Sequence, residues 1–284
     1  MAIRKIGVLG CGQMGGGIAQ ITAAAGYEVI VREITDELWR KGFARIDKSL
    51  AKFVEKEKMT GAQKDQTMAR LAGTTDLARF ADCDLVIEAV IENFDEKVKL
   101  LKELDHIAKP EAIFASNTSS LAVGDIAAHT SRPDRFCGLH FFNPVPLMKL
   151  VEVVRTLSTT DETYAAAKTF AESVGKVVVT ARDTPGFVVN LLLVPYLLDA
   201  ARAYEAGVAS RDDIDNGMKL GCGHPMGPLA LLDFIGLDTI YYIAEIMFNE
   251  FKDRRYAAPP ILKRMVNAGF LGKKSGRGFY AYTE

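Results

Sequence analysis

A glycine-rich turn near the start of the chain constrains the fold more than any other feature. The segment Gly10-Cys11-Gly12-Gln13-Met14-Gly15 directly follows the apolar run 6–9 and opens a helical pattern of small residues over 18–25. A strand, a turn with this glycine spacing and a helix are typical of a dinucleotide-binding unit, in which the helix N-terminus faces the phosphates. The glycines allow a tight turn, a close approach of backbone to pyrophosphate, and close packing of helix on strand. The sequence therefore predicts dinucleotide contacts at Gly10, Gly12, Gln13, Met14 and Gly15.

The residue after the next predicted strand indicates which dinucleotide is bound. Glu33 lies two residues after the predicted strand 28–31, at the position where an acid accepts hydrogen bonds from the adenine ribose hydroxyls. A carboxylate there also repels a 2′-phosphate, so we expect NAD rather than NADP. Arg32 favours the opposite choice, because an arginine at this edge can accommodate that phosphate. A glycine-rich turn without any ligand is the remaining alternative.

The rest of the chain predicts an α/β fold followed by a helical domain. Short apolar runs alternate with longer helical patterns, as a parallel sheet with crossover helices requires. The predicted strands are 6–9, 28–31, 85–89, 112–115, 136–140, 150–154 and 177–180, and the predicted C-terminal helices are 187–206, 211–220, 228–235 and 238–251. We expect a Rossmann-type, mostly parallel sheet with a helical insertion over 36–71, in a dinucleotide-binding domain of residues 1–183. An all-α domain for substrate binding and dimerisation should follow over residues 184–284.

Composition argues against several classes of function. The chain carries 35 Lys and Arg residues against 36 Asp and Glu residues, so it lacks the net positive field that nucleic-acid binders and polybasic membrane proteins use. Its four cysteines have neither disulfide-framework nor metal-ligand spacing, so we expect no metal site and a reducing compartment. The first predicted strand begins close to Met1, which leaves no room for a signal peptide, and the most apolar segment, 187–198, is shorter than a bilayer span. We therefore expect a cytoplasmic protein.

One histidine occupies a position typical of catalysis. His140 closes the predicted strand 136–140, and ligands of open α/β sheets bind outside the carboxyl ends of strands. Glu152 interrupts the apolar run 150–154, where a carboxylate should be buried and paired. If Glu152 accepts a hydrogen bond from one imidazole nitrogen, the other nitrogen can exchange a proton with substrate while a hydride moves to the nicotinamide. The pair predicts dehydrogenase chemistry, and a purely structural His–Glu pair is the alternative.

Two further polar residues are candidates for the reacting centre. Ser119 lies in the segment Ser116-Asn117-Thr118-Ser119-Ser120, which follows a predicted strand and precedes a helix. A capping role is the ordinary interpretation, but Ser119 at the same sheet edge as His140 could polarise a substrate carbonyl. Asn190 lies in the apolar run 187–192, where a buried amide needs partners. A structural hydrogen bond is the alternative for Asn190.

A row of cations marks the helical insertion. These residues recur at three- and four-residue steps and therefore share one helical face: Lys41, Arg45, Lys48, Lys52 and Lys56. Such a row could hold phosphates. A solvated surface, with Glu55 and Glu57 nearby, is the alternative, because most charge runs on helices do no more than this.

The motifs together resemble the short-chain 3-hydroxyacyl-CoA dehydrogenase family over nearly the whole chain. The resemblance is carried by the glycine-rich turn, Ser116-Asn117-Thr118-Ser119-Ser120, Gly138-Leu139-His140-Phe141-Phe142-Asn143-Pro144, Asp183-Thr184-Pro185-Gly186-Phe187-Val188-Val189-Asn190 and His224-Pro225-Met226-Gly227-Pro228. It implies an oxidoreductase of fatty acid metabolism that interconverts a short (S)-3-hydroxyacyl-CoA, such as 3-hydroxybutyryl-CoA, and its 3-ketoacyl-CoA with NAD. It also implies a homodimer formed through the helical domain.

The resemblance assigns roles to individual residues. It implies His140 as acid/base, Glu152 as its partner, and Ser119 and Asn190 at the reacting centre. It places Glu33, Glu92, Lys97, Ser119 and Lys274 at the cofactor, and Ser49, Lys56 and Ser119 at the substrate, where Lys52 of the basic row would join them. Two positions depart from the family pattern, because Glu33 stands where aspartate is usual and Arg32 where an apolar residue is common. Both departures concern cofactor preference and not the type of reaction.

Two other functions compete with this one. A dehydrogenase of free 3-hydroxy acids would share the two-domain plan, but by resemblance such enzymes use a lysine as acid/base where this chain offers His140 and Glu152. A non-catalytic dinucleotide-binding or structural protein would not need the set of Ser119, His140, Glu152 and Asn190. Loss of turnover with retained NAD binding would favour this second alternative.

Overall fold

The computed structural model describes residues 3–282, which form two units. The first comprises residues 3–118 and 122–184, and the second comprises 119–121 together with 185–282. The observed division after Thr184 lies one residue beyond the predicted boundary. The short segment 119–121 belongs to the second unit although its neighbours in sequence belong to the first, which no local pattern indicates.

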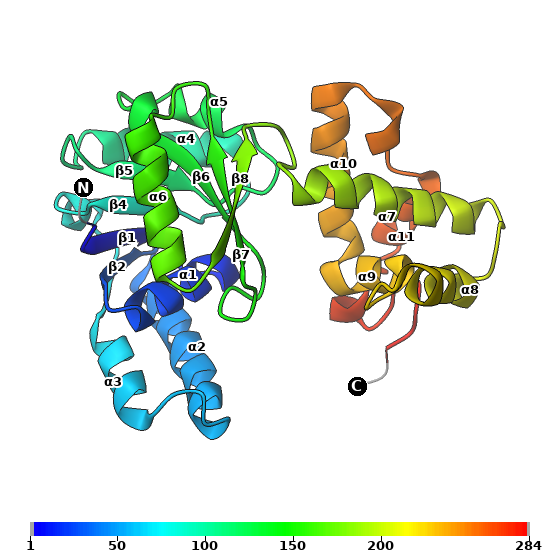
Figure 1. Ribbon diagram of the computed structural model, residues 1–284, viewed down its shortest axis with the longest axis horizontal. Helices are drawn as coiled ribbons and strands as arrows, with labels where there is room; N and C mark the ends of the chain where they lie inside the picture. The colour runs from blue at the N-terminus through cyan, green and yellow to red at the C-terminus, as the bar shows by residue number, and fades with distance from the viewer. Residues whose placement is uncertain (1–2, 283–284) are drawn as a thin grey trace. The chain divides into compact units, whose positions relative to one another are not determined.

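The first unit is built on an eight-stranded sheet with the order β3-β2-β1-β4-β5-β6-β7-β8 (Figure 1). The strands are β1 (Lys5–Leu9), β2 (Glu28–Arg32), β3 (Leu71–Thr74), β4 (Leu85–Glu88), β5 (Ile113–Ser116), β6 (Phe136–Phe141), β7 (Leu150–Arg155) and β8 (Val177–Arg182). All neighbouring strands are parallel except β6 and β7, which are antiparallel. The predicted Rossmann-type, mostly parallel sheet is therefore confirmed. The strand order reverses beside β1, and in such sheets this switch point opens the ligand crevice at the carboxyl ends of the strands.

The edge strand β3 was not predicted from the sequence. Its residues Leu71–Thr74 have the sequence LAGT, only Thr74 among them is buried, and β3 pairs with β2 alone. A short strand of small residues at a sheet edge has no apolar run for a sequence pattern to detect. Its place is set by pairing with the buried residues of β2.

Helices connect the strands of the first unit. They are α1 (Gln13–Ala24), α2 (Asp36–Glu55), α3 (Gly61–Ala69), α4 (Phe94–Asp105), α5 (Val123–Ala127) and α6 (Asp161–Ser173). The predicted insertion over 36–71 consists of α2 and α3, which lie side by side and extend beyond the sheet (Figure 1). Thr35 caps α2 by accepting a hydrogen bond from the Leu38 N–H, and Asp36 and Glu37 occupy the first turn, where carboxylates are favoured.

The second unit is helical and has a core of its own. Its helices are α7 (Val189–Glu205), α8 (Arg211–Asn216), a π-helical turn at Gly217–Gly221, α9 (Pro228–Ile235), α10 (Leu237–Phe251) and α11 (Pro260–Asn267). The predicted helix over 211–220 is thus α8 followed by the π-helical turn. The helix α11 was missed although Ile261, Leu262, Met265 and Val266 recur at helical spacing, because it is only eight residues long and short segments are ambiguous by pattern alone. Within residues 3–282, no helix combines the length and apolar character needed to cross a bilayer.

Candidate active site

The centre of the predicted chemistry is a buried histidine–carboxylate pair on adjacent strands. The antiparallel register of β6 and β7 sets His140 directly opposite Glu152. His140 Nδ1 lies 2.6 Å from Glu152 Oε2, and the two residues are only 5% and 0% exposed. A carboxylate at this distance accepts a hydrogen bond from Nδ1–H, which fixes the tautomer and stabilises an imidazolium. Proton exchange with a ligand then falls to Nε2.

Neighbouring groups hold the end of β6 in place. Asn117 Oδ1 accepts a 2.9 Å hydrogen bond from the Phe141 N–H, so the segment after β5 is tied to the residue after His140. The Phe142 ring lies 4.5 Å from the His140 ring, centroid to centroid. These contacts limit rotation of the imidazole, as a group that transfers protons at a defined point requires.

The glycine-rich turn has the geometry that a dinucleotide requires. Gly10 has φ +94°, and a Cβ there would lie 2.7 Å from the Ala89 carbonyl oxygen. A Cβ on Gly15 would lie 2.0 Å from the Gly10 oxygen, so α1 packs too closely for a side chain. In contrast, a Cβ on Gly12 would meet nothing within 4 Å, and Gly12 caps α1 without a side-chain hydrogen bond. The open space at this helix N-terminus fits a pyrophosphate.

The carboxylate at the end of β2 is bonded to this turn. Glu33 Oε1 accepts a 2.6 Å hydrogen bond from the Cys11 N–H, and Oε2 accepts one of 3.3 Å from the Ile34 N–H. Arg32 reaches the Thr75 carbonyl oxygen with its Nε at 3.5 Å. Glu33 thus places negative charge beside the glycine-rich turn, as its predicted role at the cofactor requires.

A second buried network connects two of the predicted cofactor residues. Lys97 is 1% exposed, and its Nζ lies 2.7 Å from Glu88 Oε1 and 3.1 Å from Glu92 Oε2. Burial alone would lower the pKa of Lys97, but the charges of Glu88 and Glu92 outweigh it and raise the pKa. Glu88 also accepts a 2.6 Å hydrogen bond from the Ser116 hydroxyl, and Thr118 donates one to Glu92. Lys97 therefore holds the carboxylates of Glu88 and Glu92 in position.

The second unit brings together the other two reacting-centre candidates. Asn190 Nδ2 lies 3.5 Å from the Ser119 carbonyl oxygen, which joins the first turn of α7 to the segment 119–121. In the same unit, Lys274 pairs with Asp238 at 2.6 Å. His140 and Glu152 belong to the first unit, so the joint action of Ser119 and Asn190 with them stays a prediction.

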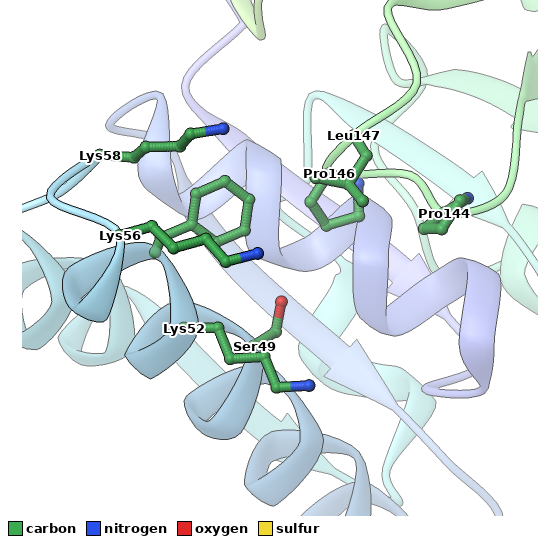
Figure 2. Close-up of a pocket in the computed structure, with 8 residues that line it drawn as sticks. Ser49, Lys52, Lys56, Lys58, Pro144, Pro146 and Leu147 are labelled. Atoms are coloured by element: carbon green, nitrogen blue, oxygen red, sulfur yellow. The ribbon is translucent and has the colours of Figure 1, made fainter. Parts of the chain in front are cut away.

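Part of the predicted basic row lines a cavity. Figure 2 shows the side chains of Ser49, Lys52 and Lys56 directed into one space, with Pro144, Pro146 and Leu147 opposite. This cavity has a volume of about 170 Å³ and is lined by Ser49, Lys52, Phe53, Lys56, Lys58, Pro144, Pro146 and Leu147. Apolar walls with ammonium groups at the rim suit an acyl-CoA, which carries both phosphates and apolar parts.

Comparisons with known proteins identify the family. The model of the 3-hydroxyacyl-CoA dehydrogenase NAD binding domain matches residues 5–184, and that of the C-terminal domain of the same family matches residues 186–282. The chain belongs to the 3-hydroxyacyl-CoA dehydrogenase family. A 3-hydroxybutyryl-CoA dehydrogenase of Mycobacterium tuberculosis is 52% identical over 99% of each chain, and the human mitochondrial hydroxyacyl-coenzyme A dehydrogenase is 45% identical over 99% of this chain and 91% of the human one. The crystal structure of (S)-3-hydroxybutyryl-CoA dehydrogenase from Ralstonia eutropha is 47% identical, covers 100% of both chains and has a TM-score of 0.97.

Two site residues of this family member escaped the sequence analysis. Glu88 ends an apolar strand with a carboxylate, the same signal that identified Glu152, and this signal would have found it. Lys58 lies beyond α2 and reaches the cavity because Glu57 adopts φ +54° and the Lys58 N–H bonds back to the Phe53 oxygen. A left-handed residue at the end of a helix is usually glycine, so a glutamate at position 57 does not predict this ending.

The thiols of this 3-hydroxyacyl-CoA dehydrogenase are free. Burial raises the pKa of Cys11 to about 11 and that of Cys137 to about 12, so both remain protonated thiols at neutral pH. Cys11 therefore contributes its backbone to the glycine-rich turn and no nucleophile. Among residues 3–282, no group of three or more His, Cys, Asp or Glu residues is arranged to hold a metal ion.

Proposed function

We propose that this protein interconverts (S)-3-hydroxybutyryl-CoA and acetoacetyl-CoA with NAD, using His140 as the acid/base. The observation that carries the proposal is the buried contact of 2.6 Å between His140 Nδ1 and Glu152 Oε2. Relatives of about this length support the proposal: the Mycobacterium tuberculosis protein is named a 3-hydroxybutyryl-CoA dehydrogenase and the Ralstonia eutropha protein an (S)-3-hydroxybutyryl-CoA dehydrogenase.

His140 performs the proton transfer. In the oxidative direction Nε2 takes the proton of the 3-hydroxyl group, and in the reductive direction the imidazolium returns it to the ketone oxygen. NAD, when bound, would accept the hydride from the carbon that carries the 3-hydroxyl group. Glu152 stabilises the imidazolium through Nδ1, so the positive charge formed on His140 remains paired inside the sheet. Acid/base catalysis by a positioned group contributes about 10²–10⁴ in rate.

Ser119 and Asn190 are proposed to contact the reacting oxygen. A hydroxyl and an amide can donate hydrogen bonds to an oxygen on which negative charge develops. Support comes from the Asn190 amide, whose Nδ2 lies 3.5 Å from the Ser119 carbonyl oxygen, so the two residues are neighbours in the second unit.

The cofactor is proposed to lie along the glycine-rich turn, with NAD preferred over NADP. Glu33 supports this preference because its carboxylate stands beside the turn and would repel a 2′-phosphate. Glu92, held by Lys97, and Lys274, held by Asp238, are proposed as further cofactor contacts. Turnover with NADPH equal to that with NADH would contradict the assigned role of Glu33.

The CoA part of the substrate is proposed to occupy the cavity of Figure 2. Lys52 and Lys56 would meet its phosphates, Ser49 would donate a hydrogen bond, and Phe53 and Leu147 would contact its apolar parts. Lys58 extends the same group of cations. Free 3-hydroxybutyrate has nothing to place in such a cavity, so the geometry favours a CoA ester over a free acid.

Two properties of the whole protein complete the proposal. We propose a homodimer formed through the second unit. In the single chain this unit exposes three large apolar side chains, Leu192 (70%), Leu220 (84%) and Phe234 (57%), which a dimer interface would cover. We also propose a cytoplasmic location, which agrees with four free thiols. Light scattering should report twice the mass of one chain, and a monomer would contradict the first of these proposals.

The proposed reaction is tested by following NADH oxidation with acetoacetyl-CoA, with free acetoacetate and NADPH as parallel reagents. We expect rapid turnover with NADH and acetoacetyl-CoA, and kcat/KM at least about a hundredfold lower with free acetoacetate, which lacks the CoA contacts. Turnover of acetoacetate alone would favour a free-acid dehydrogenase. NADH binding without any turnover would favour a non-catalytic protein.

A further inference from the structure

Arg45 of α2 is bonded to the glycine-rich turn, although it belongs to the same row of cations as Lys52 and Lys56. Its Nη2 donates a 2.6 Å hydrogen bond to the carbonyl oxygen of Cys11. The N–H of Cys11 donates to Glu33 Oε1, also at 2.6 Å. The backbone of Cys11 is therefore held on both sides, by α2 and by the end of β2.

Close packing of α2 on the turn keeps Arg45 within reach of this carbonyl. Gly42, almost one helical turn before Arg45, is buried, and a Cβ there would lie 2.1 Å from Cys11 Sγ. The helix backbone thus approaches the turn more closely than any other residue type at position 42 would allow. The guanidinium of Arg45 spans the short distance that remains.

The peptide group between Cys11 and Gly12 carries this contact to the phosphate-binding side. A trans peptide is planar, so its carbonyl oxygen and the N–H of the next residue point in opposite directions. The hydrogen bond from Arg45 to the Cys11 oxygen therefore sets the direction of the Gly12 N–H. In the part of the chain that the structure describes, the Gly12 N–H donates to no protein acceptor, and a Cβ on Gly12 would face open space. This donor lies at the N-terminus of α1, where a pyrophosphate is expected.

We propose that Arg45 is a positioning residue for the cofactor, which orients the Cys11–Gly12 peptide so that the Gly12 N–H meets a phosphate of the dinucleotide; this role presupposes the NAD-dependent function proposed above. A charged donor forms a stronger hydrogen bond to a carbonyl than a neutral one and resists rotation of the peptide when a phosphate binds. The competing role for Arg45 is direct contact with the acyl-CoA, because its side chain also lines a cavity of about 180 Å³ together with Gln13 and Ser49.

The test compares Arg45→Met and Arg45→Lys with Arg40→Met as a matched control. Arg40 is an exposed arginine on the same helix, and it reaches Asp36 only at 3.9 Å. The dissociation constant of NADH is measured by fluorescence titration without substrate, and steady-state kinetics with acetoacetyl-CoA follow. We expect Arg45→Met to weaken NADH binding about three- to tenfold. The KM for NADH should rise in parallel, while kcat, the KM for acetoacetyl-CoA and the melting temperature stay near the parent values.

Arg45→Lys distinguishes positioning from packing. Its ammonium can donate one hydrogen bond to the Cys11 oxygen, so NADH affinity should fall between the parent and Arg45→Met, and Arg40→Met should match the parent. Equal NADH dissociation constants in Arg45→Met and the parent would overturn the proposal. So would a rise confined to the KM for acetoacetyl-CoA, which would make Arg45 a substrate contact. A parent protein that binds NADH without reducing acetoacetyl-CoA would refute the reaction alone, whereas a parent that binds no NADH would overturn both proposals.

Discussion

Two buried carboxylates, one in each unit, have different kinds of partner. Glu152 of β7 is 0% exposed and bonds to the ring of His140. Asp233 of α9 is 1% exposed and accepts hydrogen bonds of 2.8 Å from the N–H groups of Phe279 and Tyr280 and one of 3.0 Å from the hydroxyl of Tyr282. Imidazole gains and loses a proton near neutral pH, whereas a backbone N–H does not, and burial raises the pKa of the Tyr282 hydroxyl further above that range. Burial and pairing alone therefore do not identify a catalytic carboxylate, and the partner that can exchange a proton does.

The comparison predicts opposite consequences of substitution. Changes at the pair of His140 and Glu152 should lower the rate and spare the fold. Changes at Asp233 should lower the free energy of unfolding and spare the rate, because Asp233 ties the C-terminal segment to α9.

The largest effect is expected from His140→Gln. Glutamine keeps a polar side chain of similar length but cannot accept and return a proton, so kcat for acetoacetyl-CoA reduction should fall at least about a hundredfold. NADH affinity and the urea unfolding midpoint should remain close to those of the parent. A variant as fast as the parent would contradict the catalytic role assigned to the pair of His140 and Glu152.

Glu152→Gln should reduce kcat by at least about tenfold, a smaller effect than at His140. The amide preserves the shape of the carboxylate but removes the negative charge that stabilises the imidazolium. The profile of kcat against pH should shift together with the loss of rate. An unchanged pH profile would reduce Glu152 to a structural role like that of Asp233.

Asp233→Ala should destabilise the protein by about 1–3 kcal/mol at neutral pH. Alanine removes both carboxylate oxygens and leaves the N–H groups of Phe279 and Tyr280 and the hydroxyl of Tyr282 without their acceptor. Urea unfolding measures this loss, and kcat at saturating substrates below the unfolding transition should stay within about twofold of the parent. A large loss of kcat in folded protein would show that the two carboxylates are more alike than their partners indicate.

The pH dependence of stability sharpens the same contrast. Burial raises the pKa of Asp233 above its usual value of 3.8, against the hydrogen bonds from Tyr280 and Phe279 that lower it. The folded state therefore binds this proton more tightly than the unfolded chain does. The resulting stabilisation is complete below pH 3.8 and is lost as pH rises through the higher pKa of the folded state. Urea unfolding at several pH values should thus show the parent losing part of its stability advantage over Asp233→Ala in this window, and parallel curves would contradict the assignment.

The smallest effect is expected for cations exposed to solvent, because water screens their interactions more than it screens those of the buried Glu152 and Asp233. Lys58→Met should raise the KM for acetoacetyl-CoA about two- to fivefold without changing kcat, because exposed ion pairs contribute about 0.2–1 kcal/mol. Lys48→Met is the matched control, since Lys48 belongs to the basic row but does not line the cavity. Equal KM values for the two variants would remove Lys58 from the substrate site.

Local patterns were sufficient for the fold class, and they named the candidate residues of the glycine-rich turn and of the strand end. The glycine-rich turn, the alternation of strands and helices, and a histidine at a strand end each depend on residues close together in sequence, whose conformational preferences act over a few residues. For the same reason the sequence indicated that Glu152 must have a buried partner, and His140 at the end of the preceding predicted strand was the candidate.

Tertiary packing decided the pairings between distant residues. The antiparallel register that sets Glu152 opposite His140, the edge strand β3 and the membership of 119–121 in the second unit all depend on contacts between distant segments. Arg45 and Lys58 show, at single residues, the same difference between what the local sequence predicts and what tertiary packing decides. A helical period placed Arg45 in a row of cations, but only the approach of Gly42 to Cys11 directed it to the glycine-rich turn, and only the left-handed turn at Glu57 brought Lys58 to the cavity. Helical period fixes the face on which a side chain stands, whereas its partner is chosen by whatever packs against that face.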